Sequence, residues 1–469
     1  MSSKNQAAMG YLPDERPPFL KLLLYAIQQI IVMFPATVTV ALITNFHIST
    51  TIFASGLATL CFVFITGRKI PLYYGSSFSY LSAILGIMAA KAAEGCDLNT
   101  QISYAQFGII MSGFVSIIAG LLVNWAGRDI IEKILPPTIT GPIAMVIGLT
   151  LATNALGDAC SLSINASGTL AVAEDAVASA TNYAWICSLV TLLSTIILSV
   201  YLKGFWGQLP LLFGPIIGCI TAYIIKLATG VNLFRVLPDA ANSGIFALPT
   251  FTLPIPSWEA VAAIMPIAIA TIPESSAHIY QLDIYVNNLA KTKGSSKTYN
   301  IADKLGLNLI GDGIGDMVSA AIGGPAGTNY GENISAMAIT KVFSVPVLMT
   351  AAVLAMIISC FTPLINAIYA IPTAVIGGLE IYLFGAIAAQ GIAIMIDKKT
   401  DMFSSKNISV IACIMIIGIG GNYGFPNGTI PFFGMNIPCI AGAAVFGILL
   451  NLLLSIGEKK KAEKAENEA

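Results

Sequence analysis

The chain is poor in charge and has almost no histidine. Only 10% of its 469 residues are Asp, Glu, Lys or Arg, and two are His, whereas charged residues make up about 25% of soluble globular domains. Hydrophobic residues account for 56%, and the mean hydropathy is +0.82. The net charge of −1 says nothing about partners, because the placement of charge matters in such a chain and its sum does not. These proportions exclude a soluble protein and indicate a polytopic membrane protein.

Sequence signatures of catalysis, metal binding and secretion are also missing. No nucleophile–base arrangement, zinc-ligand spacing or Walker sequence occurs, so an enzyme is not expected, nor is a cofactor or a metal. The N-terminus is polar and carries no basic run before a short apolar core, so no signal peptide is expected. Six of the eight cysteines lie in or beside apolar runs. Cys96 and Cys160 lie in loops that we place outside, and a bridge between them is left open.

Apolar runs of roughly 17–25 residues, the length needed to span a bilayer, recur along the chain. Ten clear ones lie near 20–43, 48–66, 104–124, 137–155, 182–202, 209–229, 257–280, 345–369, 371–395 and 431–456. Weaker or shorter ones lie near 77–92, 300–321, 331–342 and 405–420. The sequence therefore predicts an all-α membrane protein with fourteen transmembrane segments.

Basic residues favour one side of this pattern. With the N-terminus inside, only Lys91, Lys226 and Arg235 of the 23 Lys and Arg residues lie outside. Short loops rich in Lys and Arg remain in the cytoplasm. Both termini are therefore expected in the cytoplasm, and the expected location is the plasma membrane.

Two local patterns occur in both halves of the chain. Tyr-Gly-Ser-Ser-Phe-Ser at 74–79 precedes segment 3, and Tyr-Gly-Glu-Asn-Ile-Ser at 330–335 opens segment 10; Pro-Thr recurs at 137–138 and 372–373. Seven spans per half would make the halves inverted repeats. Matched short segments of this kind indicate half-helices that begin at the midplane, preceded by extended stretches, with free N–H groups facing a binding site. Chance similarity of two turns is the alternative.

Two glutamates fall within predicted spans, where a charge is costly and normally faces a cavity, a partner or a transported species. Glu274 and His278 are four residues apart and share one face of a helix. A buried carboxylate beside an imidazole is a plausible proton-binding unit. A salt bridge at the helix end, near the basic loop that begins at Lys291, is the alternative.

Glu332 lies at the start of the second short helix, where backbone N–H groups stabilise an anion. We expect it to be an ionised hydrogen-bond acceptor, with an N-terminal cap as the alternative. The turn at Ser76, Ser77 and Phe78 would face it. A planar ring with alternating N–H and C=O groups would suit two carboxylates, two helix starts and flat aromatic walls, whereas phosphate or sulfate would be repelled.

Other polar residues in predicted spans have a structural or a ligand-binding interpretation. Asp312 and Asp316 are four residues apart in a glycine-rich span. We favour a structural polar network for them over cation binding. Gln28 and Gln29 could reach the same cavity as the glutamates, and Glu380 is a weaker candidate because it could lie near a helix end.

The sequence at 330–341, Tyr-Gly-Glu-Asn-Ile-Ser-Ala-Met-Ala-Ile-Thr-Lys, resembles the signature of the nucleobase-ascorbate transporter family. Glu274 with His278, Gly-Ser-Ser-Phe at 75–78 and Gln-Gln-Ile-Ile-Val-Met-Phe at 28–34 are similar to bacterial uracil permeases of that family. The resemblance implies two inverted seven-span repeats, a core domain, a gate domain and a homodimer through the gates. The implied parts are the cytosolic N-terminus 1–19, core 20–125 and 257–369, gate 126–256 and 370–456, and the cytosolic tail 457–469.

The resemblance also implies roles for individual residues. In the family, the glutamates that match Glu274 and Glu332 hold the base, and the histidine that matches His278 is tied to proton coupling. The substrate-binding residues expected on this basis are Glu274, Glu332, Phe78, Ser77, Tyr330, Gly331, Ser335, Gln29 and Phe384, with Asp312, Asp316 and Asn333 in the structural network. The coupling ion would be a proton, with sodium not excluded.

Three positions depart from the family pattern. Gln29 stands where a histidine is usual, Ser335 where glycine is usual, and Ala277 where uracil permeases commonly have glycine. Xanthine-type members usually carry an acidic residue at the position of His278, so the histidine favours uracil. The function implied is proton-driven import of a nucleobase, uracil first. A xanthine or urate permease, and an anion exchanger or channel of the same architecture, are the alternatives.

Overall fold

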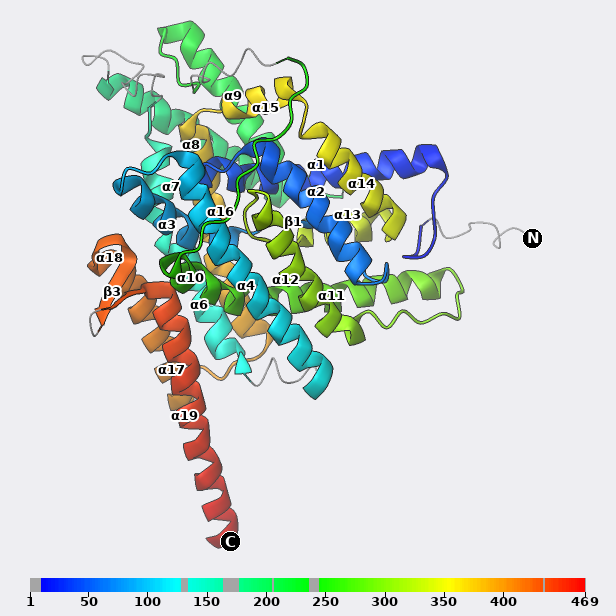
Figure 1. The fold of residues 1–469 in the computed structure, drawn as a ribbon, viewed down its shortest axis with the longest axis vertical. Coiled ribbons are helices and arrows are strands. Elements are labelled where there is room, and N and C mark those ends of the chain that lie inside the picture. The colour runs from blue at the N-terminus through cyan, green and yellow to red at the C-terminus, as the bar shows by residue number, and fades with distance from the viewer. Residues whose placement is uncertain are drawn as a thin grey trace.

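The structure, a computed structural model, describes residues 10–127, 134–162, 177–204, 206–235, 244–432 and 435–468. This part of the chain is mostly helical (Figure 1). Ten of its helical stretches are long and apolar enough to cross a membrane. They are α1 (Phe19–Thr44), α2 (Ile48–Ile65), α4 (Leu98–Ala126), α6 with α7 (Pro137–Thr150, Ala152–Ala159), α8 (Val177–Tyr201), α9 (Pro210–Thr229), α10 to α11 (Trp258–Ile264, Ala268–Thr292), α16 (Thr373–Asp397), α17 to α18 (Ser405–Met415, Gly421–Gly424) and α19 (Cys439–Glu468).

The remaining predicted segments are also helical, but shorter. These are α3 (Leu81–Ala93), α12 (Leu305–Ala321), α13 (Gly331–Thr340) and α14 (Val345–Ile358), the last followed by α15 (Thr362–Tyr369). They contain between 10 and 17 residues. A helix therefore lies at each of the fourteen predicted stretches, while the number that cross the membrane stays a prediction.

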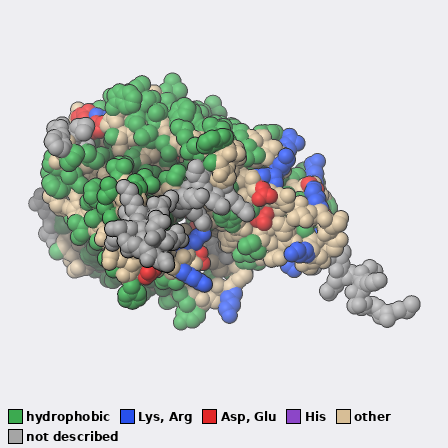
Figure 2. Space-filling model, turned by 90° about the horizontal axis from the view of Figure 1, so that it is seen from below, with side chains coloured by type: hydrophobic (Ala, Val, Ile, Leu, Met, Phe, Trp, Pro, Cys, Tyr) green, Lys and Arg blue, Asp and Glu red, His purple; other side chains and the backbone are tan. Residues whose placement is uncertain are grey.

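The outer surface of this bundle is apolar. Large hydrophobic side chains such as Leu193, Leu227 and Leu453 are more than half exposed, and hydrophobic side chains cover much of the face shown in Figure 2. Exposed apolar surface on this scale is unusual for a soluble monomer. A surrounding lipid phase accounts for it, as the composition predicts.

Two short strands pair near the centre of the bundle. Strand β1 (Tyr74–Ser76) runs antiparallel to β2 (Gly327–Asn329), with Gly75 opposite Thr328. Strand β1 leads through the 3₁₀ turn η1 (Phe78–Tyr80) into α3, and β2 leads into α13. These are the two extended stretches that the repeated pattern predicts. A second hairpin, β3 (Thr429–Phe432) with β4 (Met435–Pro438), precedes α19.

Each strand glycine makes room for a tyrosine from the other stretch. A Cβ atom on Gly75 would lie 2.3 Å from the ring of Tyr330, and one on Gly327 would lie 2.3 Å from the ring of Tyr74. Side chains at these two positions would therefore force the strands apart. Glycine is needed here for close approach rather than for an unusual backbone angle.

Small residues also bring pairs of long helices together. In α4 and α12, a Cβ on Gly113 would meet the carbonyl oxygen of Gly313 at 2.4 Å, and one on Gly313 would meet that of Gly113 at 2.3 Å. Gly141 of α6 and Gly391 of α16 are related in the same reciprocal way. Helices in lipid associate through such close backbone contact, because lipid offers no hydrophobic driving force between them.

The N-terminal residues that precede α1 are fixed to two later segments. The N–H of Tyr11 donates to the carbonyl oxygen of Lys341 at 2.8 Å, and Lys297 pairs with Asp14 at 2.6 Å. The pKa of Asp14 is lowered: burial alone would raise it, but hydrogen bonds from Lys297 and Tyr299 outweigh that effect. The N-terminal segment and the basic segment after α11 therefore lie on the same side of the molecule, as the charge pattern predicts.

Gly313→Ala tests the contact between α4 and α12. The added methyl would collide with the carbonyl oxygen of Gly113, and overpacking of this kind costs about 1–3 kcal/mol. We expect a lower unfolding temperature for the purified protein in detergent. Gly385→Ala, in α16 with open space around its Cα, is the matched control and should melt like the wild type. Equal melting of both variants would contradict the packing argument.

Candidate functional site

A cavity of about 390 Å³ lies where the two strand-helix junctions meet α6, α11 and α16. Its volume is in the range of small-molecule sites. It brings together seven of the residues predicted from the sequence. They are Phe78, Glu274, His278, Tyr330, Gly331, Glu332 and Ser335.

Helix α11 contributes a polar stripe to this cavity. Glu274, His278 and Gln281 line it at helical spacing, so all three lie on one face of the helix. Lys293, the first lysine beyond α11, pairs with Glu15 at 2.5 Å. The structure thus places Glu274 and His278 at the cavity rather than in a helix-end salt bridge with that lysine.

Helix α13 begins at the same cavity. Tyr330 is its N-cap residue and Glu332 lies in its first turn, where the positive end of the helix dipole stabilises a carboxylate. A Cβ on Gly331 would lie 2.9 Å from Nε2 of His278. Only glycine lets the start of α13 approach the imidazole so closely, which links the two predicted motifs in space.

The hydroxyl of Tyr330 forms hydrogen bonds with β1 and α1. It donates to the carbonyl oxygen of Ser76 at 2.9 Å and lies 3.0 Å from the hydroxyl of Thr37 in α1. The side chain is buried and lines the cavity. Tyr330 therefore shapes the wall, while its polar group is satisfied by protein.

Three predicted residues do not line the cavity. The hydroxyl of Ser77 accepts from the N–H of Ser79 at 3.3 Å, which caps the turn before α3. Gln29 accepts a hydrogen bond from Asn333 at 2.8 Å, which joins α1 to α13. Phe384 is packed in the apolar core of α16, with its neighbour Leu383 at the cavity instead.

The carboxylates of Asp312 and Asp316 in α12 accept hydrogen bonds from residues of β1 and β2. Asp316 accepts from the hydroxyl of Tyr74 at 2.5 Å and from the N–H of Gly327 at 2.7 Å. Asp312 accepts from the side-chain amide of Asn329 at 2.7 Å and from the hydroxyl of Ser275. Both carboxylates are thus part of a hydrogen-bond network. Asn333 is not in this network, because its amide binds Gln29.

Glu380 does not line the cavity either. It is fully buried in α16, and neither carboxylate oxygen has a hydrogen-bond partner among the described residues. Within the same part of the chain, no group of three or more His, Cys, Asp or Glu side chains could hold a metal ion. Cys96 and Cys160 are both free thiols.

The structure adds lining residues that the sequence analysis missed. The polar ones are Ser79, Thr140, Gln281, Thr328, Asn329 and Gln390. Gln281 could have been found, because it continues the face of Glu274 and His278 by one turn. Thr140 lies two residues after the repeated Pro-Thr motif at 137–138. For Gln390, the sequence shows only a polar residue within an apolar run, which does not identify a site residue.

Asp316→Ala tests the network behind the strands. It leaves the hydroxyl of Tyr74 and the N–H of Gly327 without an acceptor, at about 1–3 kcal/mol for each buried group. The unfolding temperature in detergent should fall. Thr328→Val, on strand β2 beside Gly327, is the control because the hydroxyl of Thr328 is buried and makes no hydrogen bond with any residue that the structure describes. If Thr328→Val destabilises as much as Asp316→Ala, the network is not what stabilises β2.

A polar cavity between helix starts, inside a bundle of membrane-spanning helices, is typical of a secondary transporter. The model of a Permease family, Xan_ur_permease, matches residues 20–426. The protein is a multi-pass membrane transporter and not an enzyme. It belongs to this permease family, the nucleobase-ascorbate transporter family that its motifs resemble.

Curated relatives match nearly the whole chain. A uracil permease from Bacillus caldolyticus is 34% identical over 459 residues, which cover 96% of this chain and 95% of the relative. A putative pyrimidine permease, RutG, from Escherichia coli (strain K12) is 32% identical, and the alignment covers 94% of this chain and 91% of the relative.

Solved structures share the fold at low identity. SLC26A9 aligns with a TM-score of 0.64 at 12% identity, covering 94% of this chain and 65% of that one. The transmembrane domain of the cyanobacterial bicarbonate transporter BicA aligns at 0.58 with 15% identity, covering 87% of this chain and 97% of that one. At these identities the likeness concerns the fold alone.

Proposed function

We propose that the protein imports a nucleobase, uracil in the first place, by proton symport across the plasma membrane. The observation that carries the proposal is the meeting of Glu274, His278 and Glu332 at one cavity beside the start of α13. Relatives described as uracil and pyrimidine permeases, over 94–96% of this chain, support the choice of base.

Uracil fits the chemistry of this cavity. The N–H groups of a planar pyrimidine can donate to the two carboxylates, and its carbonyl oxygens can accept from N–H groups at the starts of η1 and α13. Phe78 offers an aromatic wall. A cavity of about 390 Å³ leaves room for a single ring and accompanying water. The site is lined by segments from several helices, so movement of one helix relative to another would change the contacts to the base.

The three ionisable residues would divide the work. Glu332, at the helix start, would be the fixed acceptor for the base. Glu274 and His278, on one face of α11, would exchange the coupled proton. Sodium in place of the proton is the alternative for this step.

Substrates of other classes fit less well. Xanthine or urate is the alternative within the family, and the preference for uracil rests on the relatives above, described as a uracil permease and a putative pyrimidine permease. An anion would be repelled by Glu274 and Glu332, even though BicA, a bicarbonate transporter, has the same fold. A passive channel of this architecture would need no proton-binding pair.

The architecture that we propose is fourteen spans in two inverted seven-span repeats. Two contacts support it: α4 packs on α12 through Gly113 and Gly313, and α2 packs on α14, where a Cβ on Gly56 would lie 2.5 Å from the carbonyl oxygen of Ala352. In such a repeat, segment 4 (α4) is equivalent to segment 11 (α14), and segment 9 (α12) is equivalent to segment 2 (α2). The two contacts are therefore equivalent to each other. The core would be 20–125 and 257–369, the gate 126–256 and 370–456, with both termini cytoplasmic and dimerisation through the gates.

A second cavity lies in line with the first. It has a volume of about 420 Å³, and its lining continues that of the first cavity along two segments, with Ser82 after Ser79 and Thr150 after Ile147. Its other walls come from α10, α18, β3, β4 and α19. Along the chain, buried Ile264 and Ile267 separate the residues of α10 and α11 that line the two cavities. Movement of the core against the gate would open one cavity and close the other. The first faces inward if the ends of α11 and α16 are cytoplasmic.

Substitutions of the ionisable residues should separate binding from coupling. Glu332→Gln should abolish uracil binding, because an amide is a weaker acceptor and adds a donor. Glu274→Gln should weaken binding. His278→Ala should reduce uphill accumulation more than exchange. Binding is measured by titration, and transport by uptake of labelled uracil into vesicles with and without a proton gradient.

Ser77→Ala tests the serine that the resemblance placed in the site: its hydroxyl caps η1 and does not line the cavity, so uracil binding should weaken much less than in Glu332→Gln. Competition with xanthine, thymine and adenine tests the base. Strong inhibition by xanthine without uracil transport would show the purine alternative to be right. Equal loss of binding and coupling in all three variants would contradict the division of roles, and uptake indifferent to the gradient would contradict symport.

The two cavities can be tested by thiol accessibility. With the native cysteines replaced by serine, Gln390→Cys should react with a membrane-impermeant maleimide from the cytoplasmic face, and Asn154→Cys from the outer face. Uracil should lower the first reactivity, because Gln390 lines the site. Reaction of both variants from the same face would contradict cavities on opposite sides.

A further inference from the structure

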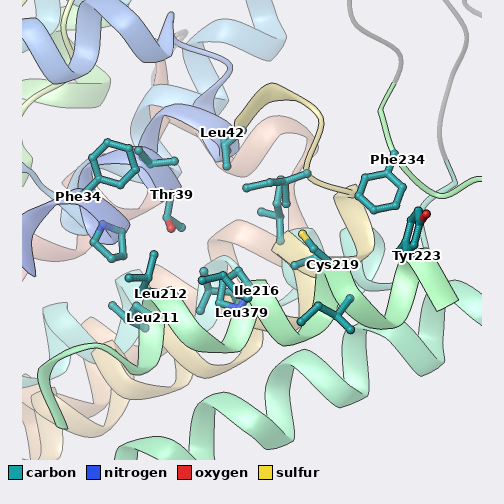
Figure 3. A pocket seen from close by; sticks show the side chains of 17 residues that line it. Phe34, Thr39, Leu42, Leu211, Leu212, Ile216, Cys219, Tyr223, Phe234 and Leu379 are labelled. Atoms are coloured by element: carbon teal, nitrogen blue, oxygen red, sulfur yellow. The ribbon is translucent and has the colours of Figure 1, made fainter. Parts of the chain in front are cut away.

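An apolar groove of about 470 Å³ separates α1 from α9 and α16, away from the polar site. In Figure 3, Phe34, Thr39 and Leu42 of α1 lie across the groove from Leu212, Ile216 and Cys219 of α9. Thr39 and Tyr223 carry the only side-chain oxygens among the residues that line it. With only two hydroxyl groups in an otherwise apolar lining, such a groove suits a hydrocarbon better than a nucleobase.

The groove lies in the part of the molecule that lipid surrounds. All three helices are long and apolar enough to span the membrane. Along α9, the lining runs from Leu211 to Tyr223. At 1.5 Å per residue this is about 18 Å, close to the depth of one leaflet, about half of the 30 Å hydrocarbon core.

The far end of the groove has the features of a membrane interface. Tyr223 and Phe234 lie together at this end (Figure 3), and aromatic residues favour the level of the lipid headgroups. Lys226, in the last turn of α9, follows Tyr223 by three residues and is exposed. It continues the face of α9 that lines the groove, where its ammonium group can reach a lipid phosphate.

The groove does not arise because α9 is loosely packed. On its other side, α9 is held against α8: a Cβ on Gly214 or Gly218 would lie within 2.0 Å of the hydroxyl oxygen of Thr195 or Thr191. The space between α9 and α1 is therefore a cleft beside a well-packed helix, open to an occupant from outside the chain.

We propose that this groove binds one acyl chain of an anionic phospholipid, with the headgroup phosphate at Lys226. The chain would fill the seam between α1 and the pair α9 and α16. If the proposed core and gate domains are right, this seam lies between the two parts that move, and the lipid would influence transport. The binding itself does not rest on the proposed function.

The experiment uses phosphatidylglycerol that carries a photoactivatable group in its acyl chain, reconstituted with the full-length protein. After illumination, mass spectrometry locates the adducts. They should concentrate on Phe34–Leu42 and Leu211–Tyr223. Ile216→Trp, which fills the groove, should remove them. Ile197→Trp, at an exposed position of α8, is the matched control and should leave them unchanged.

The headgroup is tested with Lys226→Gln. Loss of one lysine near a lipid phosphate should reduce the preference for phosphatidylglycerol over phosphatidylcholine about fivefold. An unchanged preference would overturn the role of Lys226.

Adducts spread evenly over the exposed faces of α8 and α9, or unaffected by Ile216→Trp, would overturn the groove as a lipid site. Because the adducts are read without transport, this result and the uptake assays can fail independently.

Discussion

The pairing of β1 with β2 is the interaction on which the rest of the structure depends. Backbone N–H and C=O groups inside a membrane must be satisfied by protein, and an extended chain cannot do this within itself. The two strands satisfy part of this need by pairing with each other. Side chains from neighbouring helices do the rest: Ser55 of α2 donates to the carbonyl oxygen of Tyr74 at 2.8 Å, and Asp316 of α12 accepts from the N–H of Gly327.

This pairing determines where α3 and α13 begin. Each short helix starts next to a strand that cannot move without breaking hydrogen bonds on both edges. Gly75 and Gly327 allow the tyrosine of each stretch to cross the other, and Gly331 then comes against His278. The polar cavity is thus a consequence of two helices that start inside the bundle. The apolar groove between α1 and α9 has a different origin, because its helices are continuous and long enough to cross the membrane.

Several parts of the site could be predicted because their signal is local. The spacing of Glu274 and His278 places both on one helical face, and the polar approach to Glu332 marks a helix start. Other predictions failed to reach the cavity for reasons that are not local. Gln29 and Phe384 lie in helices with suitable sequences, but the rotation of those helices turns Gln29 to Asn333 and Phe384 into the apolar core.

The sequence by itself determined the membrane class, the helical stretches, the two strand-helix junctions and the family, since each depends on composition or on motifs of a few residues. The tertiary structure decided which polar residues share a cavity and which satisfy the backbone. It placed Asp312 and Asp316 behind the strands, and Gln281 and Gln390 at the site. The physical reason is that a cavity forms where faces of distant helices meet, and the rotation of each helix depends on its packing against all the others.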